Sequence, residues 1–151
     1  MCRFSPEEGL VDATLADLPE KPRLLSVVPS LDTPVCSDQT RAFDDRLAAY
    51  GDTIAAYTIS VDLPFAQQRF CDSEGTHNTQ TLSDYKTRSF GNTWGMLVEE
   101  TQLLARGVFI LDAEGTVAYA EVVPDISHHP DYDGALRALD EVVAATGKAA
   151  R

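Results

Sequence analysis

The sequence predicts an α/β fold in which helices cover both faces of a mixed central β-sheet. Two observations support this prediction. Short β-branched runs alternate with helical segments over residues 23–90, which is typical of parallel strands joined by crossover connections. Later, two β-rich runs at 106–112 and 116–123 are separated only by Ala-Glu-Gly, which indicates an antiparallel hairpin.

The first half of the chain supplies the predicted centre of the sheet. Residues 1–22 are polar and contain three prolines, so we expect them to be irregular, with a short strand or turn around Ala13–Leu18. Arg23–Val28 contains an apolar run typical of a buried central strand. Apolar residues at helical spacing predict a helix over Asp38–Tyr50, and Thr53–Val61 is a second β-rich run.

The second half of the chain supplies the remaining predicted helices and strands. We expect a short helix over Phe65–Phe70 that leads to Cys71, a short edge strand over Thr79–Leu82 and a helical turn over Tyr85–Phe90. After the hairpin, Asp131–Thr146 reads as an amphipathic helix that ends near a glycine. The length of 151 residues without an internal repeat predicts one domain spanning 1–151.

Composition restricts the classes of function. The formal net charge is −12, from 24 acidic and 12 basic residues, which argues against nucleic-acid binding because phosphate contacts need clustered Lys and Arg. No apolar run approaches the length of about 20 residues that a membrane helix needs. The N-terminus also lacks the apolar stretch of a signal peptide, so the expected location is the cytoplasm.

Three cysteines stand out, at positions 2, 36 and 71. An odd number in a reducing compartment favours reactive thiols over a structural disulfide framework. Cys36 follows the predicted central strand and precedes a predicted helix. Free backbone N–H groups and the helix dipole at such a junction favour a thiolate, although a free cysteine in general is more often a small buried apolar residue.

Several motifs in order make the prediction more specific. The first is Pro29-Ser30-Leu31-Asp32-Thr33-Pro34-Val35-Cys36, which has the pattern Pro-x-x-x-Thr-x-x-Cys. The others are Ser60–Gln67 running on to Cys71, Thr81–Asp84, Leu104–Arg106, and Pro124–Ile126 before Tyr132. From about Leu24 to Leu139, the chain resembles the thiol peroxidase branch of the peroxiredoxins, which are atypical two-cysteine peroxidases with a thioredoxin-like fold.

The resemblance implies a role for five residues. Cys36 matches the peroxidatic cysteine, and Cys71 matches the resolving cysteine that forms a disulfide with it. Thr33 matches the hydroxyl that hydrogen-bonds to thiolate and peroxide. Pro29 matches the proline that shields the thiolate from water, and Arg106 matches the active-site arginine.

The resemblance also implies an activity and partners. Hydrogen peroxide and alkyl hydroperoxides are the expected substrates, thioredoxin is the expected reductant, and a homodimer is the expected assembly. No metal, flavin or haem cofactor is expected. Two other hypotheses remain open: a peroxide-responsive redox sensor and a non-catalytic family member. The family's usual N-terminal segment is expected to be missing, and the loop at 96–105 departs from the family pattern.

The chemistry explains why these residue types occur together. A thiolate attacks the peroxide O–O bond, and the leaving oxygen develops negative charge that needs hydrogen-bond donors. Arg106 supplies a permanent charge on a planar donor fork. Asp32 and Asp38 lie close to Cys36 in sequence and oppose its ionisation, so we expect Arg106 to be required.

Overall fold

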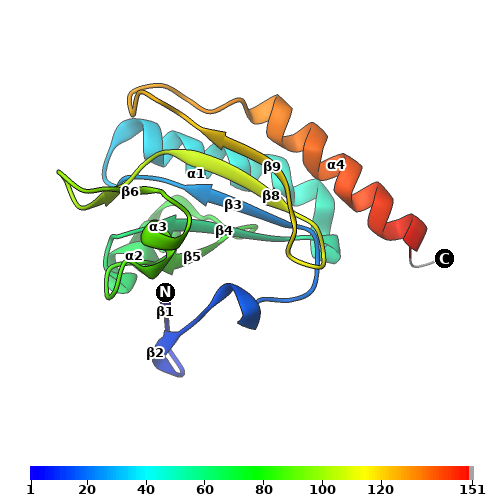
Figure 1. Cartoon of the computed structure of the whole chain (residues 1–151). Coiled ribbons are helices and arrows are strands. Elements are labelled where there is room, and N and C mark those ends of the chain that lie inside the picture. Colours follow the sequence, from blue (N-terminus) through cyan, green and yellow to red (C-terminus); the bar gives the residue numbers. More distant parts are fainter. Residues whose placement is uncertain (150–151) are drawn as a thin grey trace.

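The computed structural model describes residues 1–149 and contains a seven-stranded mixed sheet in the order β2-β1-β5-β4-β3-β8-β9 (Figure 1). The central strands β3, β4 and β5 are parallel, and the other neighbouring pairs are antiparallel. The strands are β1 (Cys2–Ser5), β2 (Gly9–Asp12), β3 (Arg23–Val27), β4 (Ala55–Ser60), β5 (Gln80–Ser83), β8 (Gly107–Leu111) and β9 (Val117–Val122). The predicted α/β class and the late hairpin are confirmed.

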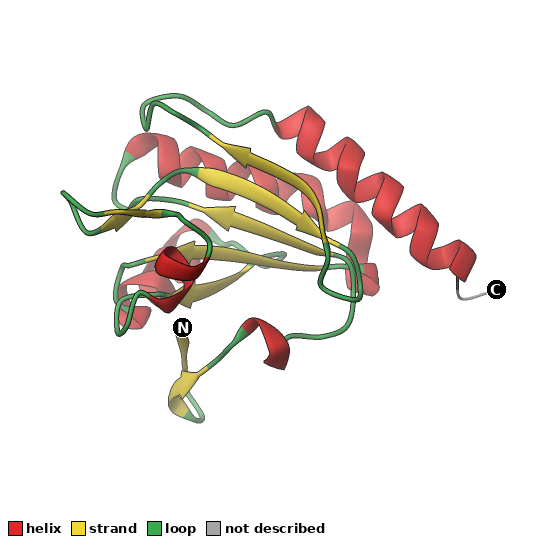
Figure 2. Ribbon diagram, viewed as in Figure 1, coloured by secondary structure: helices red, strands yellow, loops and turns green. Residues whose placement is uncertain are grey.

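Helices lie on both faces of this sheet (Figure 2). On one face, α1 and α4 bury Phe43 and Leu139 against Leu24 of β3. On the other face, the Phe90 side chain of α3 packs in a cluster with Leu25. The helices are α1 (Pro34–Leu47), α2 (Pro64–Glu74), α3 (Ser89–Thr93) and α4 (Tyr132–Ala149), and the two 3-10 helices are η1 (Leu15–Asp17) and η2 (Ala48–Thr53). Within residues 1–149, no helix combines the length and the apolarity needed to cross a bilayer.

The helix after β3 begins earlier than its apolar periodicity predicts. It starts at Pro34, whereas the prediction placed its start at Asp38. Thr33 has the extended backbone of an N-cap residue, and proline at the first helical position is preorganised for a helix and has no N–H to leave unpaired. As a consequence, Cys36 lies inside the first turn of α1 and not before it.

Other predicted elements also need correction. Residues 1–22 are not irregular throughout, because β1 and β2 form an antiparallel hairpin whose Cys2 pairs with Ser83 of β5. This pairing makes β5 an interior strand and not an edge strand. The helical turn expected over Tyr85–Phe90 is instead α3, which starts at Ser89. Within the 96–105 loop, β6 (Leu97–Val98) pairs with β7 (Leu103–Leu104).

A buried carboxylate joins α1 to the segment that precedes β5. Asp44 accepts hydrogen bonds from the backbone N–H groups of His77, Asn78 and Thr79, at 3.0, 2.6 and 3.1 Å. Its side chain is almost fully buried, so its oxygens could not be replaced by water without moving the segment. The interaction fixes the connection between α2 and β5.

We predict that Asp44→Ala lowers the free energy of unfolding by about 2–4 kcal/mol, because it leaves several buried donors without an acceptor. The neighbouring Asp45 is exposed, so Asp45→Ala is the matched control and should change stability by less than about 0.5 kcal/mol. Urea unfolding monitored by circular dichroism measures both values. Equal stability of the two variants would contradict this assignment.

Candidate active site

The centre of the site is a contact between a buried thiol and a buried guanidinium. Arg106 directly precedes β8, and its Nη2 is 3.2 Å from the Sγ of Cys36 in α1. The Cys36 side chain is 0% exposed and packs with Val28, Leu31 and Phe70. Arg106 is 1% exposed. In such a low-dielectric position, a cation beside the sulfur strongly favours negative charge on it.

Three hydrogen bonds to two neutral acceptors hold Arg106 in this orientation. Its Nη1 donates to Gln39 Oε1 at 2.9 Å, and its Nη2 and Nε donate to the carbonyl oxygen of Ile126 at 2.7 and 3.3 Å. Gln39 in turn donates from Nε2 to Ser26 Oγ at 2.8 Å. No carboxylate in the described part of the chain forms an ion pair with Arg106. Its positive charge is therefore left to act on the sulfur.

The loop that carries the Ile126 carbonyl is itself ordered by a carboxylate. Asp125 accepts hydrogen bonds from the hydroxyl and the backbone N–H of Ser127 at 2.6 and 2.8 Å. The hydrogen bond from the hydroxyl is the larger cause, and that from the N–H the second, of a pKa of Asp125 below its ordinary value of 3.8. The ionised carboxylate therefore stabilises the turn fully at pH values above 3.8. This stabilisation is lost as the pH falls through the lower pKa that Asp125 has in the folded protein.

The first turn of α1 adds backbone donors beside the sulfur. Cys36 is the third residue of the helix, where N–H groups have no partner within the helix. Thr33 is the N-cap residue, but its hydroxyl donates to Ser30 O at 3.1 Å and does not cap these groups. The N-terminal end of the helix dipole is consequently available to an anion at this point.

A second carboxylate fixes the loop between β3 and α1. Asp62 follows β4 and accepts from the Leu31 N–H at 2.8 Å and from the Ser30 hydroxyl at 2.8 Å. It also accepts from Ser60 Oγ at 2.7 Å, and Gln67 donates to that hydroxyl at 3.0 Å. The carboxyl ends of the parallel strands β3 and β4 are thereby joined, and the cysteine loop is held at this edge of the sheet.

The remaining predicted residues lie in the cysteine loop, at the N-cap of α1 and on α2. Pro29 is buried in the same loop, and Thr33 is exposed at the surface. Cys71 is half-buried on α2, and both it and Cys36 are free thiols. Arg41, which also comes from α1, is exposed and forms ion pairs with Asp38 and Glu74, so it does not join the site.

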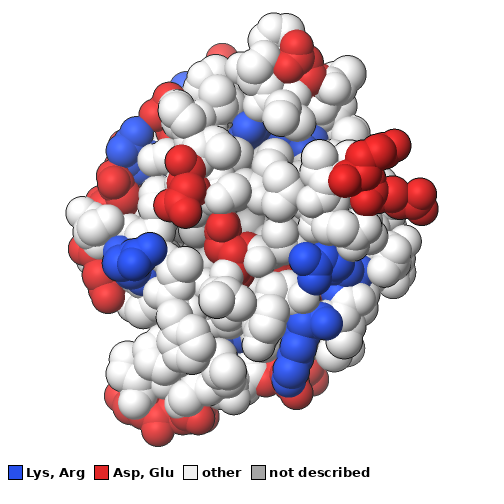
Figure 3. All heavy atoms as spheres, turned by 90° about the vertical axis from the view of Figure 1, so that its left-hand side faces the viewer, with Lys and Arg blue, Asp and Glu red and all other residues white. Residues whose placement is uncertain are grey.

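A cleft of about 460 Å³ opens between the start of α1 and α2. Its walls include Thr33 and Ser37 from the α1 side and Ala66, Arg69 and Phe70 from α2. Figure 3 shows this end of the molecule, where acidic and basic side chains are interspersed among uncharged surface. A small uncharged molecule can therefore approach this end without crossing a surface of one sign.

Sequence reasoning missed Gln39 and Asp62. A signal for Gln39 was present: it stands at helical spacing before Phe43 and Leu47, on the face of α1 that is buried. Asp62 directly follows a predicted strand, where the ends of parallel strands meet at one edge of the sheet. The Ile126 contact had no signal, because a backbone carbonyl is present at every position.

Comparisons with known proteins identify the family of the chain. The redoxin family profile matches residues 4–136. The chain belongs to the redoxin family. It is 50% identical over 129 residues to a thiol peroxidase of Listeria innocua, and the alignment covers 85% of this chain and 78% of that protein. It is 45% identical over 144 residues to a thiol peroxidase of Staphylococcus aureus, with 92% and 87% covered.

Two solved structures are similar to this one. A peroxiredoxin-like protein from Aquifex aeolicus is 39% identical with a TM-score of 0.77, and the match covers 82% of this chain and 72% of that one. AhpC from Enterococcus faecalis is 19% identical with a TM-score of 0.79 over 91% and 85%, which supports the fold alone. The thioredoxin-like fold and the thiol peroxidase resemblance are confirmed, and the chain is an enzyme of the peroxiredoxin type.

We predict that Gln39→Leu slows oxidation of the Cys36 thiol by hydrogen peroxide by about 10- to 100-fold, because Arg106 loses the acceptor that orients it. Stopped-flow fluorescence measures the rate. Gln68→Leu is the matched control and should leave the rate unchanged, since Gln68 donates to Asp72 on the same helix.

A merely structural role for Gln39 would leave the reactivity of the folded protein unaltered. We therefore also expect folded Gln39→Leu to react more slowly with iodoacetamide at Cys36, because a misplaced guanidinium stabilises negative charge on the sulfur less. An unchanged alkylation rate in folded Gln39→Leu would contradict the positioning role.

Proposed function

We propose that this enzyme reduces hydrogen peroxide and small alkyl hydroperoxides, with Cys36 as the peroxidatic residue. The observation that supports this most directly is the 3.2 Å contact between Cys36 Sγ and Arg106 Nη2 in a buried setting. A buried guanidinium that has no carboxylate partner is costly unless it serves an anion, and the thiolate is that anion. The cleft beside Thr33 and Phe70 is the proposed entrance for the peroxide.

The first step is a displacement at oxygen. The Cys36 thiolate donates an electron pair to one peroxide oxygen, the O–O bond breaks, and the other oxygen leaves as hydroxide or alkoxide and takes up a proton. The sulfur becomes a sulfenic acid, so it is oxidised by two electrons while the peroxide is reduced to water or an alcohol. Arg106 and the amides of the first turn stabilise the leaving oxygen, and the exposed Thr33 hydroxyl turns from Ser30 to the peroxide.

The second step forms a disulfide within the chain. The Cys71 thiol attacks the Cys36 sulfenic acid, a disulfide forms and water leaves. The two residues lie on separate helices, so part of α2 unwinds to bring them together. The exposed residues Asp72–Glu74 and the left-handed Gly75 cap, at a φ of 66°, support local unwinding there, because few buried contacts are lost.

Reduction by thioredoxin completes the cycle in this proposal. Its dithiol opens the Cys36–Cys71 disulfide and is itself oxidised, so electrons balance over the whole reaction. Three free cysteines suit a reducing compartment, and we place the enzyme in the cytoplasm. Pro29, buried in the cysteine loop, keeps water away from the sulfur, and a homodimer is the proposed assembly.

We predict that Cys36→Ser abolishes peroxide-dependent oxidation of thioredoxin. Cys71→Ser should retain one rapid oxidation per chain and lose turnover with thioredoxin, because the sulfenic acid forms but is not resolved. Cys2→Ser is the matched control, since Cys2 lies in β1, away from the cleft, and should turn over normally. Consumption of NADPH by thioredoxin and thioredoxin reductase measures turnover.

Two outcomes separate the alternatives. A wild-type protein that stops after one equivalent of peroxide, with excess thioredoxin present, would be a sensor and not a peroxidase. Comparably slow oxidation of wild type and Cys36→Ser would indicate a non-catalytic family member.

We predict that Arg106→Met lowers the rate of Cys36 oxidation by about 10²–10³-fold, as removal of one donor to a developing oxyanion does in other enzymes. Arg106→Lys keeps the charge but lacks the fork that reaches Gln39 and Ile126, so it should recover only part of the rate. Arg46→Met, at an exposed arginine of α1, is the control and should react like wild type. A wild-type rate in folded Arg106→Met would disprove the electrostatic role.

A further inference from the structure

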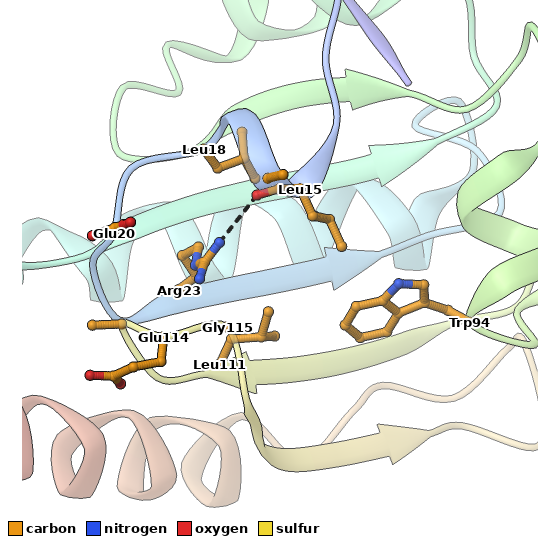
Figure 4. Close-up of a pocket in the computed structure, with 10 residues that line it drawn as sticks. Leu15, Leu18, Glu20, Arg23, Trp94, Leu111, Glu114 and Gly115 are labelled. Atoms are coloured by element: carbon orange, nitrogen blue, oxygen red, sulfur yellow. Dashed lines mark hydrogen bonds between the residues drawn. The ribbon is translucent and has the colours of Figure 1, made fainter.

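A second pocket, of about 550 Å³, lies at the opposite end of β3 from the peroxide site. Arg23 opens β3, whereas Cys36 follows the other end of that strand. The pocket is enclosed by η1, the turn between β8 and β9, and a side chain of the α3 region (Figure 4). Its walls include Leu15, Leu18, Arg23, Trp94, Leu111 and Gly115.

Arg23 is buried without an anionic partner. Its side chain is 5% exposed, and no carboxylate of residues 1–149 forms an ion pair with it. Among the described residues its Nη1 and Nη2 make only long hydrogen bonds, to Leu15 O at 3.3 Å and Asp112 O at 3.4 Å, and its Nε has no partner there. Arginine is almost never buried unless it is paired, so these spare donors point to a missing anion.

Two carboxylates at the rim do not fill this role. Glu20 and Glu114 are both exposed, and Figure 4 shows their carboxylates directed away from the Arg23 guanidinium. Exposed charges of this kind are screened by salt, whereas a buried guanidinium is not. The two acids therefore weaken but do not cancel the local attraction for an anion.

The rest of the pocket is apolar. Trp94 stacks on Phe90 with ring centroids 5.2 Å apart and meets Phe109 edge-on at 5.0 Å, so its indole ring is held in place. Figure 4 shows Arg23 and Trp94 at opposite ends of the pocket, with Leu111 and Leu15 between them. One charged anchor and a longer apolar wall are typical of a site for an amphipathic small molecule.

We propose that this pocket binds a small organic carboxylate, whose carboxylate pairs with Arg23 and whose apolar body lies along Leu15 and Leu111 toward Trp94. The planar guanidinium fork matches carboxylate geometry and forms charge-assisted hydrogen bonds that the present carbonyl contacts do not provide. The site uses no residue of the peroxide centre and stands independently of the proposed peroxidase function.

Octanoate binding to the full chain tests this proposal. Trp94 is the only tryptophan of the protein, so its fluorescence reports on this pocket alone. Octanoate should shift the emission with a saturable dependence on concentration. Octanamide, its neutral analogue, should bind at least about tenfold more weakly because it lacks the charge. Inorganic phosphate, which has no apolar body, should give no saturable shift.

Two variants locate the binding. Arg23→Gln should weaken octanoate binding at least about tenfold, and it removes an unpaired buried charge, which a protein tolerates better than the loss of one member of a buried pair. Ala113→Leu fills part of the pocket while Arg23 is retained, and should also weaken binding. Arg3→Gln, at an exposed arginine paired with Glu8, is the matched control and should bind as wild type does.

Peroxidase turnover should be the same in wild type, Arg23→Gln and Ala113→Leu, because the pocket and the thiol lie at opposite ends of β3. Equal affinity for octanoate and octanamide would show a merely apolar cavity and overturn the proposal. So would an unchanged affinity in Arg23→Gln, or the absence of any saturable fluorescence change with octanoate.

Discussion

The contact between Cys36 and Arg106 is the constraint on which the site depends. The sulfur is fully buried, and the guanidinium at hydrogen-bond distance is a positive charge that can stabilise negative charge on it. The cation is itself expensive to bury, so it needs acceptors that do not neutralise it. Gln39 and the Ile126 carbonyl meet this need because both accept hydrogen bonds without carrying charge.

The fold supplies these groups from parts of the sequence that are far apart. The cysteine comes from the helix after β3, the arginine directly precedes β8, and β3 and β8 pair in the sheet. The Ile126 carbonyl comes from the loop after β9, which pairs with β8. Asp62, after β4, holds the cysteine loop from the other side. Strand pairing thus sets the distance between the thiol and the guanidinium, and short hydrogen bonds in the loops set their orientation.

The sequence was sufficient for the order of the main elements and for the residues that carry charge or sulfur. Strands such as Arg23–Val27 and the β8–β9 hairpin are predictable because apolar or β-branched runs and turn residues act locally. The β1–β2 hairpin was missed because its short strands, such as Gly9–Asp12, contain glycine or charged residues, and pairing with β5 stabilises them only in the folded chain. Gln39 was missed for a similar reason, because its role depends on a hydrogen bond with Arg106, which is 67 residues away in the sequence.

A comparison of the two buried arginines, Arg106 and Arg23, supports both sites. Arg106 donates to a sulfur, an amide oxygen and a carbonyl oxygen, and each of these groups is within 3.3 Å. Arg23 is nearly as buried, yet it has two long bonds to carbonyls, and its Nε has no partner within residues 1–149. Burial removes similar hydration from both guanidinium groups, so the two arginines differ in how well the surrounding acceptors replace that hydration. At Arg106 the sulfur of Cys36 lies at hydrogen-bond distance as a further acceptor, and at Arg23 the anion that we propose would complete the set.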